Sequence, residues 1–187
     1  GGPTLLRMER IAIVSAVRTP ISKFLGSLSP LSSVDLGAVA VSAALAKAGV
    51  DGADVDELYM GQARQLGSGP NPARQVSIKA GCGEGAVATT INKACGSSLK
   101  AIDLARAAIL LDAQKVVVAG GMESMSTIPF LLPDYRRGYR LGHKEVLDGN
   151  YQDGFTCGIL NEPMGMTAEY LVDEYKLTRQ SQDEYAL

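Results

Sequence analysis

Cys95 is the residue of this sequence best placed to act as a nucleophile. It lies between a β-branched run that ends near Asn92 and an apolar helical pattern that begins near Leu99. A helix N-terminus presents unpaired N–H groups and partial positive charge, which stabilise a thiolate and can hold a developing oxyanion during acyl transfer. The alternative is a buried cysteine that packs as a small hydrophobic residue. The residues at this junction leave both interpretations open.

Few other residues have the type or spacing needed for catalysis or metal binding. No two cysteines have CxxC spacing and His143 is the single histidine, so we expect no metal site. Three cysteines are too few for a disulfide scaffold, which favours a reducing compartment. We expect Cys82 to be a loop or packing residue, and we regard Cys157 as a weaker candidate for the wall of a substrate channel.

Composition and charge exclude several classes of function. The 187 residues are 46% hydrophobic and 20% charged, which is enough apolar material for a substantial core. The formal net charge of −2 argues against nucleic-acid binding, and no apolar run is long enough to span a membrane. We therefore expect neither nucleic acid nor a membrane among the partners of this protein.

The two ends of the sequence are expected to differ from the rest. Residues 1–7 (GGPTLLR) precede Met8, and we expect an added or unstructured extension there. Residues 181–187 (SQDEYAL) fall inside a helical pattern that has no stop signal. We therefore expect the sequence to be part of a longer chain.

Strand and helix patterns alternate through the first two thirds of the sequence. Short β-branched or apolar runs predict four strands, at residues 10–17, 57–61, 86–92 and 115–119. Capping residues and helical spacing predict helices that begin after Ser32, after Asn71 and directly after Cys95. This order predicts an α/β fold with a mixed, mainly parallel sheet and helices on both faces.

A change in the sequence pattern after Gly121 predicts a second region. Residues 122–163 contain no long periodic stretch, and helical spacing returns only at residues 166–175. We therefore divide the sequence into an N-terminal α/β domain at residues 8–121 and part of an insertion, or loop domain, at residues 122–187.

Five motifs, in order along the chain, resemble the thiolase family. They are AIVSAVRTPISKF at 12–24, MGQARQLGSGPNPARQ at 60–75, NKACGSSLKAI at 92–102, VVVAGGMESMS at 116–126, and PMGMTAEYL at 163–171 with TRQSQDEYAL at 178–187. Together they cover nearly the whole sequence from Met8 onward. The resemblance implies the N-terminal half of the layered thiolase fold, with part of its loop domain.

The resemblance also implies an acyltransferase in which Cys95 is the nucleophile. In thiolases an acyl group passes from acyl-CoA to a cysteine, and the acyl-enzyme then reacts with CoA or with the enolate of acetyl-CoA. Cys95 would form this thioester, and its backbone N–H would contribute to an oxyanion hole. Met164 matches a family methionine beside the acyl pocket and is a weaker candidate for substrate binding, since a methionine there could equally fill a gap in the core.

Partners and setting follow from the same resemblance. Acyl-CoA and acetyl-CoA are the expected partners, coenzyme A is substrate or product, and no cofactor is expected to be bound permanently. Thiolases are homodimers or homotetramers, so self-association is expected. The expected setting is fatty acid metabolism in the cytoplasm, or in an organelle matrix if the source is eukaryotic.

The sequence departs from the family pattern in ways that limit the prediction. The family's histidine in a GHP motif and its second cysteine in a CxGGG motif do not occur, so we expect this chain by itself to be incomplete for catalysis. Ser98 stands where many thiolases have glycine. Pro163 stands where many short-chain biosynthetic thiolases have histidine, which leaves acetyl-CoA acetyltransferase and 3-ketoacyl-CoA thiolase both open.

Two other functions remain alternatives. A ketosynthase-like condensing enzyme would share the fold and the strand-cysteine-helix arrangement, although the RTP, NPARQ and GGMES segments favour a thiolase. A non-catalytic fragment or assembly module would explain the missing motifs. Among the charged residues, we expect Glu123 to be a hydrogen-bonded carboxylate that shapes the site rather than a general base. For the basic residues at 136–144, a solvated loop or subunit contact is favoured over binding of CoA phosphates.

Overall fold

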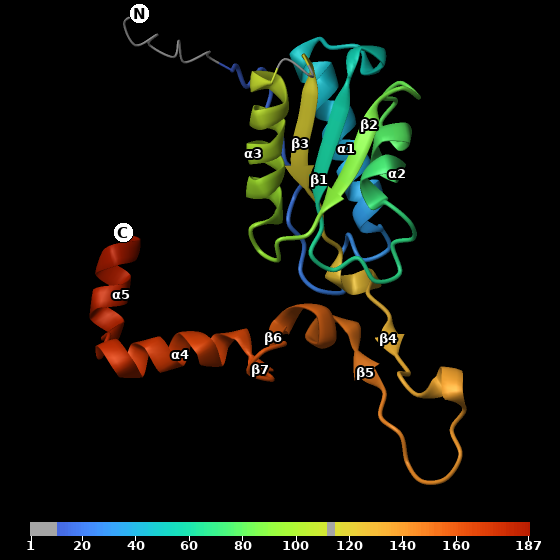
Figure 1. The fold of residues 1–187 in the computed structure, drawn as a ribbon. Coiled ribbons are helices and arrows are strands. Elements are labelled where there is room, and N and C mark those ends of the chain that lie inside the picture. Colours follow the sequence, from blue (N-terminus) through green and yellow to red (C-terminus); the bar gives the residue numbers. More distant parts are fainter. Residues whose placement is uncertain (1–10, 112–114) are drawn as a thin grey trace, which may run out of the picture. The chain divides into compact units, whose positions relative to one another are not determined.

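The computed structural model describes residues 11–111 and 115–187 and divides into two compact units, one ending at Ile128 and one beginning at Pro129. The expectation for residues 1–7 lies outside the described residues. The first unit is an α/β core, shown with the second unit in Figure 1. The boundary that we expected after Gly121 stays a prediction.

A three-stranded parallel sheet forms the centre of the first unit. Its strands are β1 (Glu57–Gly61), β2 (Val87–Ile91) and β3 (Val117–Gly121), in the spatial order β2-β1-β3. β1 is the central strand and pairs in parallel with both neighbours. Its Leu58 and Met60 side chains are 0% and 2% exposed, because a central strand is covered on both faces. Three of the four expected strands are thus confirmed, and the pairings among them are parallel.

Three helices cover the two faces of this sheet, as predicted. They are α1 (Ser33–Ala48), α2 (Pro72–Lys79) and α3 (Ser97–Leu110). The side chain of Met60 lies against α1, whereas the next residue, Gly61, lies against the first turn of α3. Side chains alternate between the faces of a strand, so α1 and α3 lie on opposite faces of the sheet. Figure 1 shows α3 apart from α1 and α2, which pack together.

The apolar core lies mainly between β1 and the helix pair α1 and α2. Leu58 and Met60 pack there with buried valines of both helices and with Cys82. α3 approaches the other face through a different kind of surface, a stripe of small residues at Ser97, Ala101 and Ala105 with i, i+4 spacing. Small side chains allow the backbone of α3 to lie close to the strands, which places the start of this helix near the ends of β1 and β3.

The strand predicted at residues 10–17 is wrong for the residues that the structure describes. Residues 11–22 form neither helix nor strand, and the side chains of Ile13 and Val14 are 82% and 71% exposed. One contact of this segment is a hydrogen bond from Lys47 Nζ to the Ala16 carbonyl, at 3.2 Å. A β-branched run has the propensity for a strand, but a strand also needs a neighbouring strand to share its backbone hydrogen bonds.

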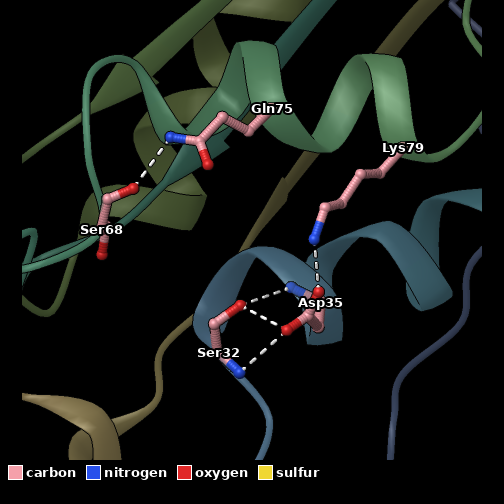
Figure 2. Close-up of polar contacts among 5 residues, drawn as sticks. All are labelled: Ser32, Asp35, Ser68, Gln75 and Lys79. Carbon is pink, nitrogen blue, oxygen red and sulfur yellow. Dashed lines mark hydrogen bonds and ion pairs between the residues drawn. The ribbon is translucent and has the colours of Figure 1, made fainter.

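The ends of α1 and α2 follow the capping signals of the sequence. Ser32 caps α1 and forms a capping box with Asp35, and Gly49 ends the helix with φ of +66°. Asn71 caps α2, and Pro72 occupies its first turn. Figure 2 shows the capping box, together with the Gln75 side chain that ties α2 to the carbonyl of Ser68 at 2.8 Å.

An ion pair joins the start of α1 to the end of α2. The carboxylate of Asp35 accepts hydrogen bonds from the Ser32 hydroxyl and backbone N–H, and from Lys79 Nζ at 2.6 Å (Figure 2). The bonds from Lys79 and Ser32 lower the pKa of Asp35 from 3.8 to about 2. The ionised carboxylate therefore stabilises the folded state above about pH 4, and this stabilisation is lost as the pH falls through about 2.

We expect Asp35→Asn to destabilise the protein at neutral pH and to flatten its acid dependence. The expected loss is about 1 kcal/mol, because the partly exposed pair is screened by solvent. Thermal unfolding between pH 2 and pH 7 measures it: the difference between the wild type and Asp35→Asn should shrink as the pH falls below about 4. Asp103→Asn is the control, since the Asp103–Lys100 pair is exposed and has no capping role. Equal pH dependence in both variants would contradict this account.

The second unit contains two small antiparallel strand pairs and two helices. β4 (Phe130–Leu131) pairs with β5 (Leu147–Asp148), and β6 (Thr156–Cys157) pairs with β7 (Glu162–Pro163). The helices are α4 (Met164–Tyr175) and α5 (Arg179–Ala186). Short helical turns occur in both units, at Gly52–Asp54, Met125–Thr127, Tyr135–Arg137 and, as a π-helix, Tyr151–Phe155. Over residues 11–111 and 115–187, no helix is long and apolar enough to cross a membrane.

Candidate active site

Cys95 lies on the turn that connects the end of β2 to the start of α3. β2 ends at Ile91 and α3 begins at Ser97, so the cysteine occupies the strand-to-helix junction that the sequence predicted. Cys95 is exposed in this chain. Within the described part of the chain, no side chain caps the start of α3. The N-terminal N–H groups of this helix carry partial positive charge next to the thiol.

The residue before the nucleophile candidate has a strained backbone. Ala94 has φ of +46°, a region that residues other than glycine seldom adopt and that costs about 1–2 kcal/mol. Hydrogen bonds on both sides hold it there. The Ala94 N–H donates to Asn92 Oδ1 at 3.0 Å, while the Ala94 carbonyl accepts from the Ser97 N–H at 3.1 Å and from the Ser97 hydroxyl at 2.6 Å.

Ser97 fastens the turn from the helix side. Its side chain is buried, and its Oγ accepts a hydrogen bond from the Lys93 N–H at 2.8 Å while its hydroxyl donates to the Ala94 carbonyl. The Gly96 N–H donates to the Lys93 carbonyl at 3.0 Å. The turn that carries Cys95 is therefore closed by several bonds of its own, and strained positions held in this way are frequent at functional sites.

Two glycines at the ends of β1 and β3 make room for the start of α3. A Cβ added to Gly61 would lie 2.6 Å from the carbonyl carbon of Ser97 and 2.7 Å from the nitrogen of Ser98. A Cβ on Gly121 would lie 2.8 Å from the Cβ of Ser98. All three distances are shorter than real Cβ contacts, so a side chain at either glycine would force the strand end and the start of α3 apart.

Glu123 follows β3 and holds the loop that follows β1. Its carboxylate accepts hydrogen bonds from the Ala63 N–H at 3.0 Å and from the Arg64 N–H at 3.2 Å. Burial raises the pKa of Glu123, and the two backbone N–H groups oppose this shift. From the other side, Asn92 Nδ2 donates to the Ala63 carbonyl at 3.0 Å. The same loop therefore contacts both Glu123 and the turn of Cys95, which agrees with a shaping role for Glu123.

The sequence did not single out Asn92, Ser97, Gly61 or Gly121 as parts of this site. A weak signal existed for Asn92, because asparagine often accepts a hydrogen bond from the N–H two residues later in a turn. The contacts of Gly61 and Gly121 join residues far apart in the sequence. No local pattern predicts such contacts.

The other cysteines differ from Cys95 in their surroundings. Cys82 is buried in the apolar core, where burial raises the pKa of its thiol. Its packing role is thus as expected. Cys157 is partly exposed on β6 of the second unit. Within residues 11–111 and 115–187, no group of three His, Cys, Asp or Glu side chains is arranged to hold a metal ion.

Several candidates from the sequence lie in the second unit. Met164 is the first residue of α4, and its side chain is half exposed. Its role in substrate binding stays a prediction, as does any role of Cys157 in a substrate channel. The basic stretch lines a hollow of about 250 Å³ formed by Asp134, Arg137, Gly138, Arg140, Leu141 and Lys144. Lys144 pairs there with Asp134 at 3.4 Å, so part of its charge is already balanced.

We expect iodoacetamide to label Cys95 at least about tenfold faster than Cys82 under native conditions. The thiol of Cys95 is exposed beside a helix N-terminus, whereas burial both shields Cys82 and lowers its thiolate fraction. Peptide mapping after brief labelling measures the ratio. Labelling in urea is the control: once the protein is unfolded, Cys95 and Cys82 should be labelled at similar rates. Equal labelling of the native protein at all three cysteines would argue against an activated Cys95.

The chain is similar to one family of known proteins, both in sequence and in structure. Residues 11–187 match the model of the thiolase N-terminal domain. The chain is 47% identical over 183 residues to the cytosolic acetyl-CoA acetyltransferase ERG10 of Gibberella zeae, covering 98% of this chain and 46% of that protein. It is 48% identical over 181 residues to the acetyl-CoA acetyltransferase of Escherichia coli, covering 96% and 46%.

Solved structures agree with these matches. A crystal structure of the Acat5 thiolase from Ascaris suum in complex with coenzyme A is similar with a TM-score of 0.86 and 40% identity, covering 92% of this chain and 45% of that one. The acetyl-CoA acetyltransferase of Syntrophomonas wolfei gives a TM-score of 0.86 at 34% identity, covering 93% and 44%. The chain spans about half the length of the curated relatives it matches. It belongs to the thiolase family and corresponds to the N-terminal half of its members.

Proposed function

We propose that the full-length protein containing this chain is an acyl-CoA:acetyl-CoA C-acyltransferase, and that Cys95 is its acyl-accepting nucleophile. The observation that carries the proposal is the exposed Cys95 thiol on a strained, hydrogen-bonded turn at the uncapped start of α3. The names of the relatives support acetyl-CoA acetyltransferase as the more specific activity, and 3-ketoacyl-CoA thiolase is the broader alternative.

In the proposed reaction the thiolate of Cys95 attacks the thioester carbonyl of an acyl-CoA. A new C–S bond forms, the bond to the CoA sulfur breaks, and CoA leaves as a thiol after taking up a proton. The N–H groups at the start of α3 are suited to stabilise the oxyanion that develops on the carbonyl oxygen. The acyl group then passes to CoA or to the enolate of acetyl-CoA. Coenzyme A is thus substrate or product, and Met164 is proposed to line the acyl pocket.

The 187-residue chain by itself is proposed to be incomplete for this reaction. A base is needed to take the proton of the Cys95 thiol, and a second group is needed to move the proton of the α-carbon. The family's GHP and CxGGG motifs, which supply these groups, do not occur in the 187 residues. We therefore place both proton-transfer groups in the half of the relatives that this chain does not cover.

The setting of the enzyme is part of the same proposal. A homodimer or homotetramer agrees with the many exposed apolar side chains of the chain, such as Leu99 and Ile102 on α3. A cytoplasmic location agrees with the relative from Gibberella zeae, which is a cytosolic acetyl-CoA acetyltransferase. A role in fatty acid metabolism follows from the proposed acyl-CoA substrate.

An acetylation experiment tests the proposal directly. The full-length protein is incubated with acetyl-CoA, quenched in acid, digested, and analysed by mass spectrometry for an acetyl thioester. We expect one acetyl group on the peptide that contains Cys95, and release of CoA in equal amount. We also expect thiolysis of acetoacetyl-CoA by the full-length protein and little turnover by the 187-residue chain. An acetyl group on another residue, or none at all, would contradict the role of Cys95.

A further inference from the structure

We infer that Asn92 is a positioning residue for Cys95, tying the turn that carries the thiol to the loop held by Glu123. The inference rests on the proposed function of Cys95. Asn92 makes no contact with a reacting atom in this account. It acts through two hydrogen bonds of its side chain, one to each of the segments that it joins.

The first bond controls the strained residue next to the nucleophile. Asn92 Oδ1 accepts from the Ala94 N–H at 3.0 Å, two residues along the chain. This bond offsets part of the cost of the positive φ at Ala94. Without this hydrogen bond, we expect Ala94 to relax toward a negative φ. Cys95 would then turn away from the start of α3.

The second bond fixes the turn to a different part of the fold. Asn92 Nδ2 donates to the Ala63 carbonyl at 3.0 Å. The N–H of Ala63 in turn donates to the Glu123 carboxylate at 3.0 Å. Residues from the ends of β1, β2 and β3 are thereby joined in one hydrogen-bonded path. The path runs from Glu123 through Ala63 and Asn92 to Ala94, and it ends beside Cys95.

Asparagine is suited to this place because it accepts and donates through one short side chain. An aspartate would accept from Ala94 but could not donate to the Ala63 carbonyl. A serine would retain a weaker form of the bond to Ala94 and lose the reach to Ala63. The two bonds can therefore be separated by substitution.

The test compares Asn92→Ala, Asn92→Ser and wild type in the full-length protein. For Asn92→Ala we expect kcat for acetoacetyl-CoA thiolysis to fall at least about tenfold while KM changes less than about twofold, because misplacement of a reacting group by about 1 Å can cost about 100-fold in rate. Asn92→Ser should recover part of kcat. In a second measurement, the alkylation rate of Cys95 relative to Cys157 in the same sample should fall about threefold or more in Asn92→Ala.

Asn71→Ala is the matched control. Asn71 also accepts from a backbone N–H, that of Arg74 at 3.3 Å, and donates to a backbone carbonyl, that of Ala88 at 3.0 Å. It caps α2, however, and has no bond to the turn of Cys95. We expect Asn71→Ala to lower the melting temperature and to leave the relative alkylation of Cys95 unchanged. If Asn92 had only a structural role, Asn92→Ala would likewise lower the melting temperature and leave the relative alkylation of Cys95 unchanged.

The outcomes separate this inference from the proposed function. If wild type is acetylated on Cys95 and Asn92→Ala keeps its kcat and its alkylation ratio, the positioning role is overturned and the acyltransferase proposal stands. A change in KM alone would also overturn it. If wild type is not acetylated on Cys95, the proposed function fails, while the alkylation ratio still reports whether Asn92 positions the thiol.

Discussion

Replacing Cys95 with serine in the full-length protein is expected to abolish the acetyl thioester and to lower kcat by about a thousandfold or more. The serine hydroxyl has nearly the same size, so the turn between β2 and α3 should be kept. Its oxygen is a much weaker nucleophile than a thiolate, because a serine hydroxyl is essentially un-ionised at neutral pH. Removal of a nucleophile normally costs several orders of magnitude in rate.

The measurement combines thiolysis kinetics with mass spectrometry of the acid-quenched enzyme. Cys82→Ala serves as the control, because Cys82 is buried in the apolar core. This variant should lose some stability but still become acetylated on Cys95. Retained turnover in Cys95→Ser, or loss of acetylation in a folded Cys82→Ala variant, would contradict the assignment of the nucleophile.

Replacing Gly61 with alanine is expected to destabilise the first unit by about 3 kcal/mol, near the upper end of overpacking costs. The new Cβ would lie 2.6 Å from the carbonyl carbon of Ser97, and backbone cannot rotate away as a side chain can. Either β1 or the first turn of α3 must move. For a chain of this size we expect a fall in melting temperature of about 6–12 °C. The alkylation rate of Cys95 should change as well, because its turn is attached to the displaced helix.

Gly85→Ala provides a matched control in the same unit. A Cβ on Gly85 meets no atom within 4 Å, so the same substitution adds a methyl group without a clash. It should change the melting temperature little and leave Cys95 unaffected. Similar melting temperatures for Gly61→Ala and Gly85→Ala would show that α3 does not need the space at the end of β1.

The sequence predicted most of the local structure in the first unit. Ser32 and Gly49 mark both ends of α1, and Asn71 and Pro72 mark the start of α2, where the structure has them. These signals are short-range: a capping side chain bonds to a backbone N–H only two or three residues away. The same reasoning placed Cys95 between a strand and a helix, because the patterns on either side change their period there.

The strand expected at residues 10–17 shows the limit of this reasoning. Its β-branched residues fit a strand, yet Ile13 and Val14 are largely exposed and the segment pairs with no strand that the structure describes. Propensity is a property of a segment, whereas pairing depends on a neighbour supplied by another part of the fold.

The sequence by itself determined that Cys95 would sit at the start of a helix, within a parallel α/β arrangement whose motifs resemble the thiolase family. The tertiary structure alone decided how that cysteine is held. Gly61 and Gly121 admit the start of α3, and Asn92 meets the loop bound to Glu123. Capping and periodicity act over a few residues, but these contacts join strands separated by tens of residues. Only folding brings such residues together.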